Sequence, residues 1–255
     1  MNISKKIIFL MTLPMIFVLV AFIMSSFITQ PERPETNVTP PFYVGERMTY
    51  EVRLVNSSGA YVLYKLNLSV TEISTINGRA CFVLRGEYLG YDFVIYSFVT
   101  KDNLTLLKTL MESPVGSATI TYDYEKRKCE IFVLTNKDPS PQRAEADIKP
   151  YLQDPLSTVY YIRSLPLSEG YWCTFNQIDV MSGLTSVIKV SVRGLSNIST
   201  AVGAFDCYEI SLEARGSKTI VYITTTGFKV PVKVEVPYGR DTFQVWELIE
   251  YSSTS

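Results

Sequence analysis

The chain has 255 residues, enough for one large or two small domains, and 47% of them are hydrophobic, which is ample for a buried core. Its net charge of −1 gives no reason to expect a nucleic-acid partner, and the absence of histidine removes the usual general base and the commonest metal ligand. There is also no Gly-x-Ser-x-Gly motif, and nothing in the spacing of the acidic residues selects a catalytic pair. We therefore expect neither an enzyme nor a metal or cofactor site.

The N-terminal part of the chain predicts a membrane anchor. An apolar segment over residues 7–28 follows Lys5 and Lys6, and as a helix it would be roughly 33 Å long, enough for a hydrocarbon core of about 30 Å. The lysines favour a cytoplasmic stub over residues 1–6, which makes the chain a single-pass protein of the cell membrane with its C-terminal domain outside the cytoplasm. A cleaved signal peptide is the alternative, but no small-x-small cleavage site follows the segment.

The number of N-glycosylation sequons agrees with a location of the domain outside the cytoplasm. Six of the nine asparagines stand in Asn-x-Ser/Thr sequons, and the five that lie beyond the anchor are Asn37, Asn56, Asn67, Asn103 and Asn197. A β protein rich in serine and threonine forms some sequons by accident. Six exceed that expectation, so we predict that the five outer sites carry glycans.

The four cysteines predict two disulfides. Their number is even and none has Cys-x-x-Cys spacing, which favours disulfides in an oxidising compartment over a zinc or redox site. Three pairings are possible. We favour Cys81–Cys129 and Cys173–Cys207, because each pair would join strands in the same half of the chain.

A proline-rich segment over residues 29–41 predicts a stiff linker that holds a single β domain, residues 42–251, away from the membrane. Residues 48–54 and 62–70 alternate apolar with polar side chains, as in a sheet with one face in water. Further short strands are predicted at 80–87, 91–99, 106–111, 118–124, 129–135, 171–179, 186–195, 204–215, 218–225, 229–238 and 242–251.

Two segments interrupt this pattern. The polar, proline-containing residues 136–150 predict a loop, and Pro231 and Pro237 indicate that 229–238 is an edge strand or contains a strand end. The sum predicts a mainly β fold with one central helix. The β part is a large antiparallel, strongly curved sheet, or an open barrel or sandwich.

The central helix is expected over about residues 154–165. Asp154 suits the N-cap, Pro155 the first helical position and Pro166 the residue beyond the end. Ser157 is thereby interpreted as a first-turn residue and not as a nucleophile. The helix is apolar nearly all round, which predicts that it is enclosed by the sheet.

Arg163 is a charged residue on this otherwise apolar helix, and its charge requires either a carboxylate partner or contact with water. It stands at the end of an apolar stripe that includes Tyr160, so it either pairs with a buried carboxylate, for which Glu46 is the candidate, or faces water at the helix C-terminus, where a cation is favoured. The sequence leaves both possibilities open.

Two stretches resemble a known family. The residues Tyr-Val-Gly-Glu-Arg-Met-Thr-Tyr-Glu-Val at 43–52 and Asp-Pro-Leu-Ser-Thr-Val-Tyr-Tyr-Ile-Arg at 154–163 resemble the opening and the central signature of the exported family named domain of unknown function 3108. Residues 203–208 and 231–233 resemble its C-terminal strands, so the resemblance covers about residues 42–250. It implies an exported β domain without an assigned activity.

The outline of that family is similar to the lipoprotein-carrier proteins, which hold acyl chains between a curved sheet and a helix. By this analogy of fold we expect an extracytoplasmic domain that binds a lipid-like or apolar ligand between helix and sheet, with Tyr160, Tyr161, Arg163 and Glu46 as candidate ligand contacts. The surplus of aromatic residues supports the alternative of a carbohydrate-binding module, and a cell-surface structural or interaction module is the other alternative.

Overall fold

The computed structural model describes residues 40–136, 138–180 and 182–253. The predicted cytoplasmic stub, the anchor and nearly all of the linker, residues 1–39, lie outside this part of the chain. Within the described residues, no helix has the length and apolar character needed to cross a membrane.

The described part of the chain forms one sheet of fifteen strands. The first eight strands are β1 (Arg47–Asn56), β2 (Gly59–Ile76), β3 (Arg79–Leu89), β4 (Phe93–Thr100), β5 (Leu106–Ser113), β6 (Gly116–Asp123), β7 (Lys128–Thr135) and β8 (Asp138–Asp147). The remaining strands are β9 (Leu152–Gln153), β10 (Trp172–Ile178), β11 (Thr185–Thr200), β12 (Gly203–Ala214), β13 (Ser217–Thr224), β14 (Pro231–Gly239) and β15 (Thr242–Ser252). The helix α2 (Pro155–Ser164) stands between β9 and β10.

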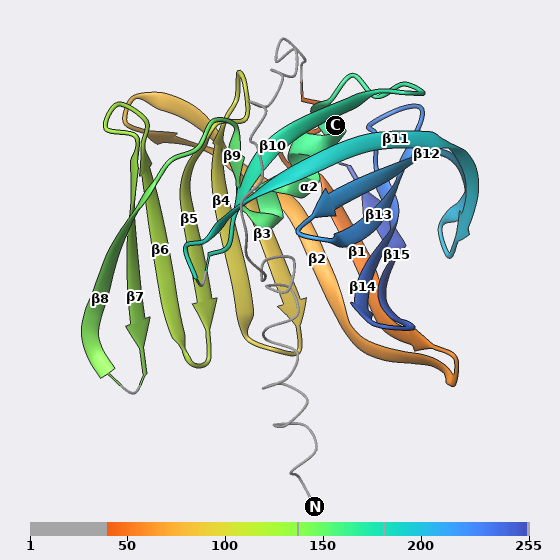
Figure 1. Ribbon diagram of the computed structural model, residues 1–255, viewed down its shortest axis with the longest axis horizontal. Coiled ribbons are helices and arrows are strands. Elements are labelled where there is room, and N and C mark those ends of the chain that lie inside the picture. The colour runs from red at the N-terminus through yellow and green to blue at the C-terminus, as the bar shows by residue number, and fades with distance from the viewer. Residues whose placement is uncertain (1–39, 137, 181, 254–255) are drawn as a thin grey trace, which may run out of the picture.

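The strands follow a simple order, β8-β7-β6-β5-β4-β3-β2-β1-β15-β14-β13-β12-β11-β10-β9. Neighbours are antiparallel except for β9 and β10, which are parallel. The first strand therefore pairs with the last, and β8 and β9 are the two open edges. Figure 1 shows this sheet bent so that β3–β8 and β10–β15 stand on either side of α2. The open, curved sheet was one of the predicted alternatives, and it is the one that the chain adopts.

The inner face of the sheet carries the alternating apolar residues that the sequence predicts. On β1 the buried apolar side chains are Met48, Tyr50 and Val52, and on β2 they are Leu66, Leu68 and Val70. Because successive residues of a strand point to opposite faces, this pattern turns one face of each strand toward α2 and the other toward solvent.

The prediction of a loop over residues 136–150 is wrong, because β8 lies in this segment and pairs antiparallel with β7. An outer strand needs no apolar alternation when its side chains face water, so the usual sequence signal is missing. Pro141 is tolerated because β8 hydrogen-bonds to a neighbour on one side only.

Strand β14 is not at an edge, since it pairs with both β13 and β15. The other alternative, a strand end, is correct for Pro231 but not for Pro237, which lies inside β14. Pro231 is its first residue and Pro237 stands at a shift in register.

One glycine sets the distance between the helix and the sheet. A Cβ atom on Gly86 of β3 would lie 3.0 Å from the Ile95 side chain and 3.4 Å from that of Leu156 on α2. The missing side chain allows α2 to pack closely on the β3–β4 region, which leaves its opposite face toward β10–β15.

Candidate functional site

The helix α2 begins with the cap that the sequence predicts. The Asp154 carboxylate accepts a hydrogen bond from the Ser157 backbone N–H at 2.7 Å, and the Ser157 Oγ accepts one from the Asp154 N–H at 2.9 Å. This is a capping box, in which two free backbone donors are satisfied reciprocally. Pro155 occupies the first turn as expected, and Ser157 is a capping residue.

The same carboxylate fixes the helix to the N-terminal half of the sheet. Its Oδ2 accepts hydrogen bonds at 2.6 Å from the hydroxyls of Ser97 on β4 and Thr109 on β5. Asp154 is fully buried. Burial raises its pKa, and the hydrogen bonds from Ser97, Thr109 and Ser157 offset that effect only in part.

The other end of the helix is held by Arg163 and Glu46, which form the buried pair that the sequence left as one of two possibilities. Arg163 donates to the two Glu46 carboxylate oxygens at 2.8 and 2.7 Å, and both side chains are 0% exposed. Burial by itself lowers the pKa of Arg163, but the hydrogen bonds and charge of Glu46 outweigh it and leave that pKa above its ordinary value. The alternative of a solvent-facing cation is wrong.

Arg163 also binds the backbone of the segment before β14. Its guanidinium donates to the carbonyl oxygens of Lys229 and Phe228, each at 3.0 Å. Tyr251 of β15 donates to Glu46 at 3.1 Å. The pair thus joins the start of β1, the end of α2 and the last strands of the domain.

Aromatic rings surround this pair. Arg163 lies 5.3 Å from the ring centre of Phe42 and 5.4 Å from that of Tyr160, within the range of a cation–π contact. Tyr161 points elsewhere and packs edge-on against Phe175 of β10, with ring centres 5.2 Å apart. Glu46, Tyr160 and Arg163 are therefore neighbours, and Tyr161 is not part of their cluster.

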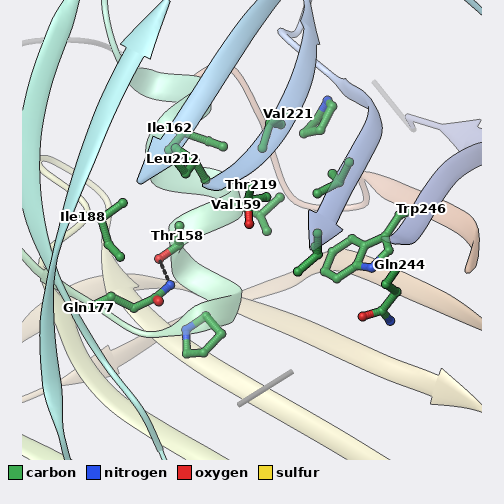
Figure 2. Close-up of a pocket in the computed structure, with 14 residues that line it drawn as sticks. Thr158, Val159, Ile162, Gln177, Ile188, Leu212, Thr219, Val221, Gln244 and Trp246 are labelled. Carbon is green, nitrogen blue, oxygen red and sulfur yellow. Dashed lines mark hydrogen bonds between the residues drawn. The ribbon is translucent and has the colours of Figure 1, made fainter. Parts of the chain in front are cut away.

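An apolar cavity lies along the face of α2 that is turned toward β10–β15 (Figure 2). It encloses about 70 Å³, and the whole space between its walls, including a mouth open to solvent, is about 700 Å³. The helix contributes residues at i, i+3, i+4 and i+7, which share one face: Pro155, Thr158, Val159 and Ile162. The sheet contributes Gln177, Ile188, Leu212, Thr219, Val221, Pro231, Val234, Val236, Gln244 and Trp246.

None of the four candidate ligand contacts named from the sequence lines this cavity. Glu46, Tyr160 and Arg163 hold the end of the helix, and Tyr161 packs on Phe175 of β10. Their role as ligand contacts stays a prediction. The wall residues that the sheet contributes carry no local sequence signal, because each is one inward position of an ordinary strand.

The predicted disulfides are not formed, and all four cysteines are free and buried. Cys81 on β3 and Cys129 on β7 are separated by three strands, a distance of roughly 19 Å along the sheet, whereas a disulfide needs Cα atoms within about 7 Å. Cys173 on β10 pairs with Val190 of β11, which in turn pairs with Leu212 of β12. Cys207 is five residues from Leu212 along β12, so it does not lie opposite Cys173. Strands in the same half of a sheet need not be neighbours, so the predicted pairing is wrong.

The sequons differ in accessibility. Asn103 and Asn197 are exposed, Asn56 and Asn67 are partly buried, and Asn37 lies outside the described residues. The Oδ1 atom of Asn67 is buried without a hydrogen-bond partner among the described residues. Glycosylation of these sites stays a prediction.

Among the residues that the structure describes, no group of three Cys, Asp or Glu side chains is placed so that it could hold a metal ion.

The family model described as protein of unknown function (DUF3108) matches residues 48–245. The chain belongs to this family. The resemblance stated from the sequence is thereby confirmed, and its two principal stretches, 43–52 and 154–163, meet in space through Glu46 and Arg163. No curated protein matches the chain.

Two solved structures are similar to this family member at low sequence identity. One is a candidate lipoprotein from Parabacteroides distasonis, with 12% identity, a TM-score of 0.31, and coverage of 84% of this chain and 99% of the other. The second is a candidate exported protein with a YmcC-like fold from Bacteroides fragilis, with 10% identity, a TM-score of 0.31, and coverage of 85% and 100%.

Proposed function

We propose that this chain is a membrane-tethered extracytoplasmic domain that binds a small apolar molecule in the cavity between α2 and β10–β15. The observation that carries the proposal is the cavity itself. Protein interiors are normally packed as densely as organic crystals, and an apolar gap costs stability. A partly open gap along one helix face, walled by Val, Ile and Leu side chains, has the character of a ligand site.

The contacts at the two ends of α2 support this role. Asp154 attaches the start of the helix to β4 and β5, and Arg163 attaches its end to Glu46 and to the segment before β14. A helix fixed at both ends cannot move inward to fill the gap beside it. In this proposal Asp154, Glu46 and Arg163 therefore position the helix and keep the cavity open, and the ligand contacts come from the wall residues.

The extracytoplasmic address rests on the apolar segment 7–28 with its preceding lysines and on the sequons. The chain enters the domain beside the end of α2, where Phe42 is buried and packs edge-on against Tyr160 at 5.1 Å. A tether at this point would hold the helix region close to the linker. The role proposed here is one of binding, without catalysis.

Mass spectrometry of the full chain, purified natively from membranes, tests the proposal. We expect a co-purifying apolar molecule with the wild type. Val221→Phe, which places a ring in the cavity, should remove it. Val187→Phe is the matched control, because Val187 is 44% exposed on the outer face of β11, and this variant should retain the molecule.

Equal amounts of the molecule in both variants, or none in any form of the protein, would contradict the proposal. Binding on a glycan array in the absence of an apolar ligand would favour the carbohydrate-binding alternative instead.

A further inference from the structure

Three polar atoms in the cavity walls lack a hydrogen-bond partner among the described residues: Gln177 Oε1, Thr219 Oγ1 and Trp246 Nε1. Gln177 is 2% exposed and Thr219 is 3% exposed. Buried polar atoms are hydrogen-bonded in the great majority of cases, and an unsatisfied one is destabilising. A ligand with polar groups could form the missing hydrogen bonds to these three atoms in the wall of the apolar cavity.

The network around Gln177 determines which of its amide atoms is available. The Thr158 hydroxyl donates its proton to the Asp154 carbonyl oxygen at 2.7 Å, so it can only accept from Gln177, whose Nε2 lies 2.9 Å away (Figure 2). The amide nitrogen therefore faces Thr158, and the carbonyl oxygen Oε1 is left as an acceptor. A ligand that satisfies it must carry a hydrogen-bond donor.

Thr219 Oγ1 and Trp246 Nε1 are the other two polar atoms for which a ligand could supply a hydrogen-bond partner. Gln177 is on β10, Thr219 on β13 and Trp246 on β15, so the three lie on strands spread across the concave C-terminal half. The indole N–H of Trp246 is a donor only, and the Thr219 hydroxyl can donate or accept. The walls thus offer an acceptor at one end, a donor at the other and an adaptable group between them.

The cavity walls contain no charged side chain to pair with an ionised head group. Arg163, the basic residue of α2, already forms hydrogen bonds with Glu46 and with backbone carbonyl oxygens. A carboxylate or phosphate placed beside Gln177, which is 2% exposed, would be buried without a counter-ion, which is far more costly than burying a neutral polar group.

Resting on the proposed function, the geometry points to the class of ligand: an uncharged amphiphile, an apolar chain that bears a hydroxyl or similar neutral donor, and not a fatty-acid anion or a phospholipid. Its donor would bind Gln177 Oε1, and its oxygen would accept from Thr219 or Trp246 according to where it lies along the cavity.

The test is calorimetric titration of the full chain in detergent with three probes of similar size: 1-octanol, its ether isomer 1-methoxyheptane, and octanoate. We expect 1-octanol to bind at least about tenfold more tightly than either of the others, since the ether lacks the donor and octanoate is charged. Gln177→Leu should reduce the preference for 1-octanol over the ether to less than about threefold.

Gln153→Leu is the matched control, because Gln153 is also a buried glutamine with an unpartnered Oε1 but lies outside the cavity. It should leave the preference unchanged. Thr219→Val, nearly the same shape as the wild type, provides a second test. It should weaken the binding of 1-octanol and of the ether alike by severalfold, because the oxygen of either molecule can accept from the Thr219 hydroxyl.

The possible results distinguish an error in the ligand class from an error in the proposed function. If octanoate or the ether binds as tightly as 1-octanol, or if Gln177→Leu retains the full preference, the neutral-donor assignment is wrong while a ligand cavity stands. If no probe binds, and the natively purified protein also carries no apolar molecule, the proposed function itself fails.

Discussion

Glu46 and Arg163, 117 residues apart in the chain, form a two-bond ion pair with no exposed surface on either side chain. Removing one partner leaves the other charge buried and unpaired. We expect Glu46→Ala and Arg163→Ala each to lower the free energy of unfolding by about 3–5 kcal/mol, measured by denaturant titration. The double variant should be no less stable than Arg163→Ala alone, and additive costs would contradict the pairing.

A surface pair provides the control for this experiment. Lys128 and Asp147 join β7 to β8 at 2.8 Å, but their side chains are 48% and 65% exposed. Solvent screens such a pair and its side chains lose entropy when they associate. Lys128→Ala should therefore leave the unfolding midpoint unchanged within error.

Asp154 predicts a specific pH dependence. Burial raises its pKa above the ordinary value of 3.8, so the folded state favours the protonated form. The contribution of this group to stability is fully present below 3.8 and is lost as the pH rises through the raised pKa. Asn cannot titrate and keeps the shape of the cap. The stability advantage of wild type over Asp154→Asn should thus decline as the pH rises above about 3.8, across the range in which the buried carboxyl titrates.

The measurement is the free energy of unfolding of both proteins across this range. An advantage that grows with rising pH would mean that the buried carboxylate is stabilised in its charged form, contrary to this expectation. Asp154→Ala removes the cap altogether and should be about 2 kcal/mol less stable than Asp154→Asn at every pH, because neither of these side chains titrates.

The four thiols should be inert in the folded protein. All are buried, and burial raises the pKa of Cys207 to about 11, so little thiolate is present at neutral pH. Iodoacetamide should label no cysteine of the folded chain and all four in denaturant without reductant. A non-reduced peptide map that contains a Cys–Cys cross-link would contradict the free-thiol structure.

Among the sequons, Asn103 should be the best acceptor of a glycan. It is exposed between β4 and β5, and its Oδ1 accepts from the Thr105 hydroxyl at 2.6 Å, within the Asn-Leu-Thr triplet. Asn67 lies in the middle of β2, with a buried Oδ1. Expressed in a host that glycosylates exported proteins, the chain should carry a glycan that Asn103→Gln removes and Asn67→Gln does not. An unmodified Asn103 in such a host would count against the outer location of the domain.

The local features of the chain could be predicted because their chemistry is local. Asp154, Pro155 and Ser157 lie within four positions of one another, and the cap they form depends on backbone groups of the same helical turn. The apolar alternation of β1 and β2 likewise follows from the two-residue period of a strand. Even the Glu46–Arg163 pair was a candidate, since a cation on an enclosed helix requires a carboxylate.

Other features were decided only when the sheet closed around the helix. β8 has no apolar pattern and is a strand because β7 offers it an edge. The predicted cysteine pairs are not formed because β3 and β7 are not neighbours, and neither are β10 and β12. The cavity depends on Gln177, Thr219 and Trp246, which belong to three separate strands. A residue's own sequence surroundings determine its backbone and the face on which it lies. Which distant side chains meet it, and whether they leave a gap, depends on strand order and curvature, and these come from the packing of the whole sheet.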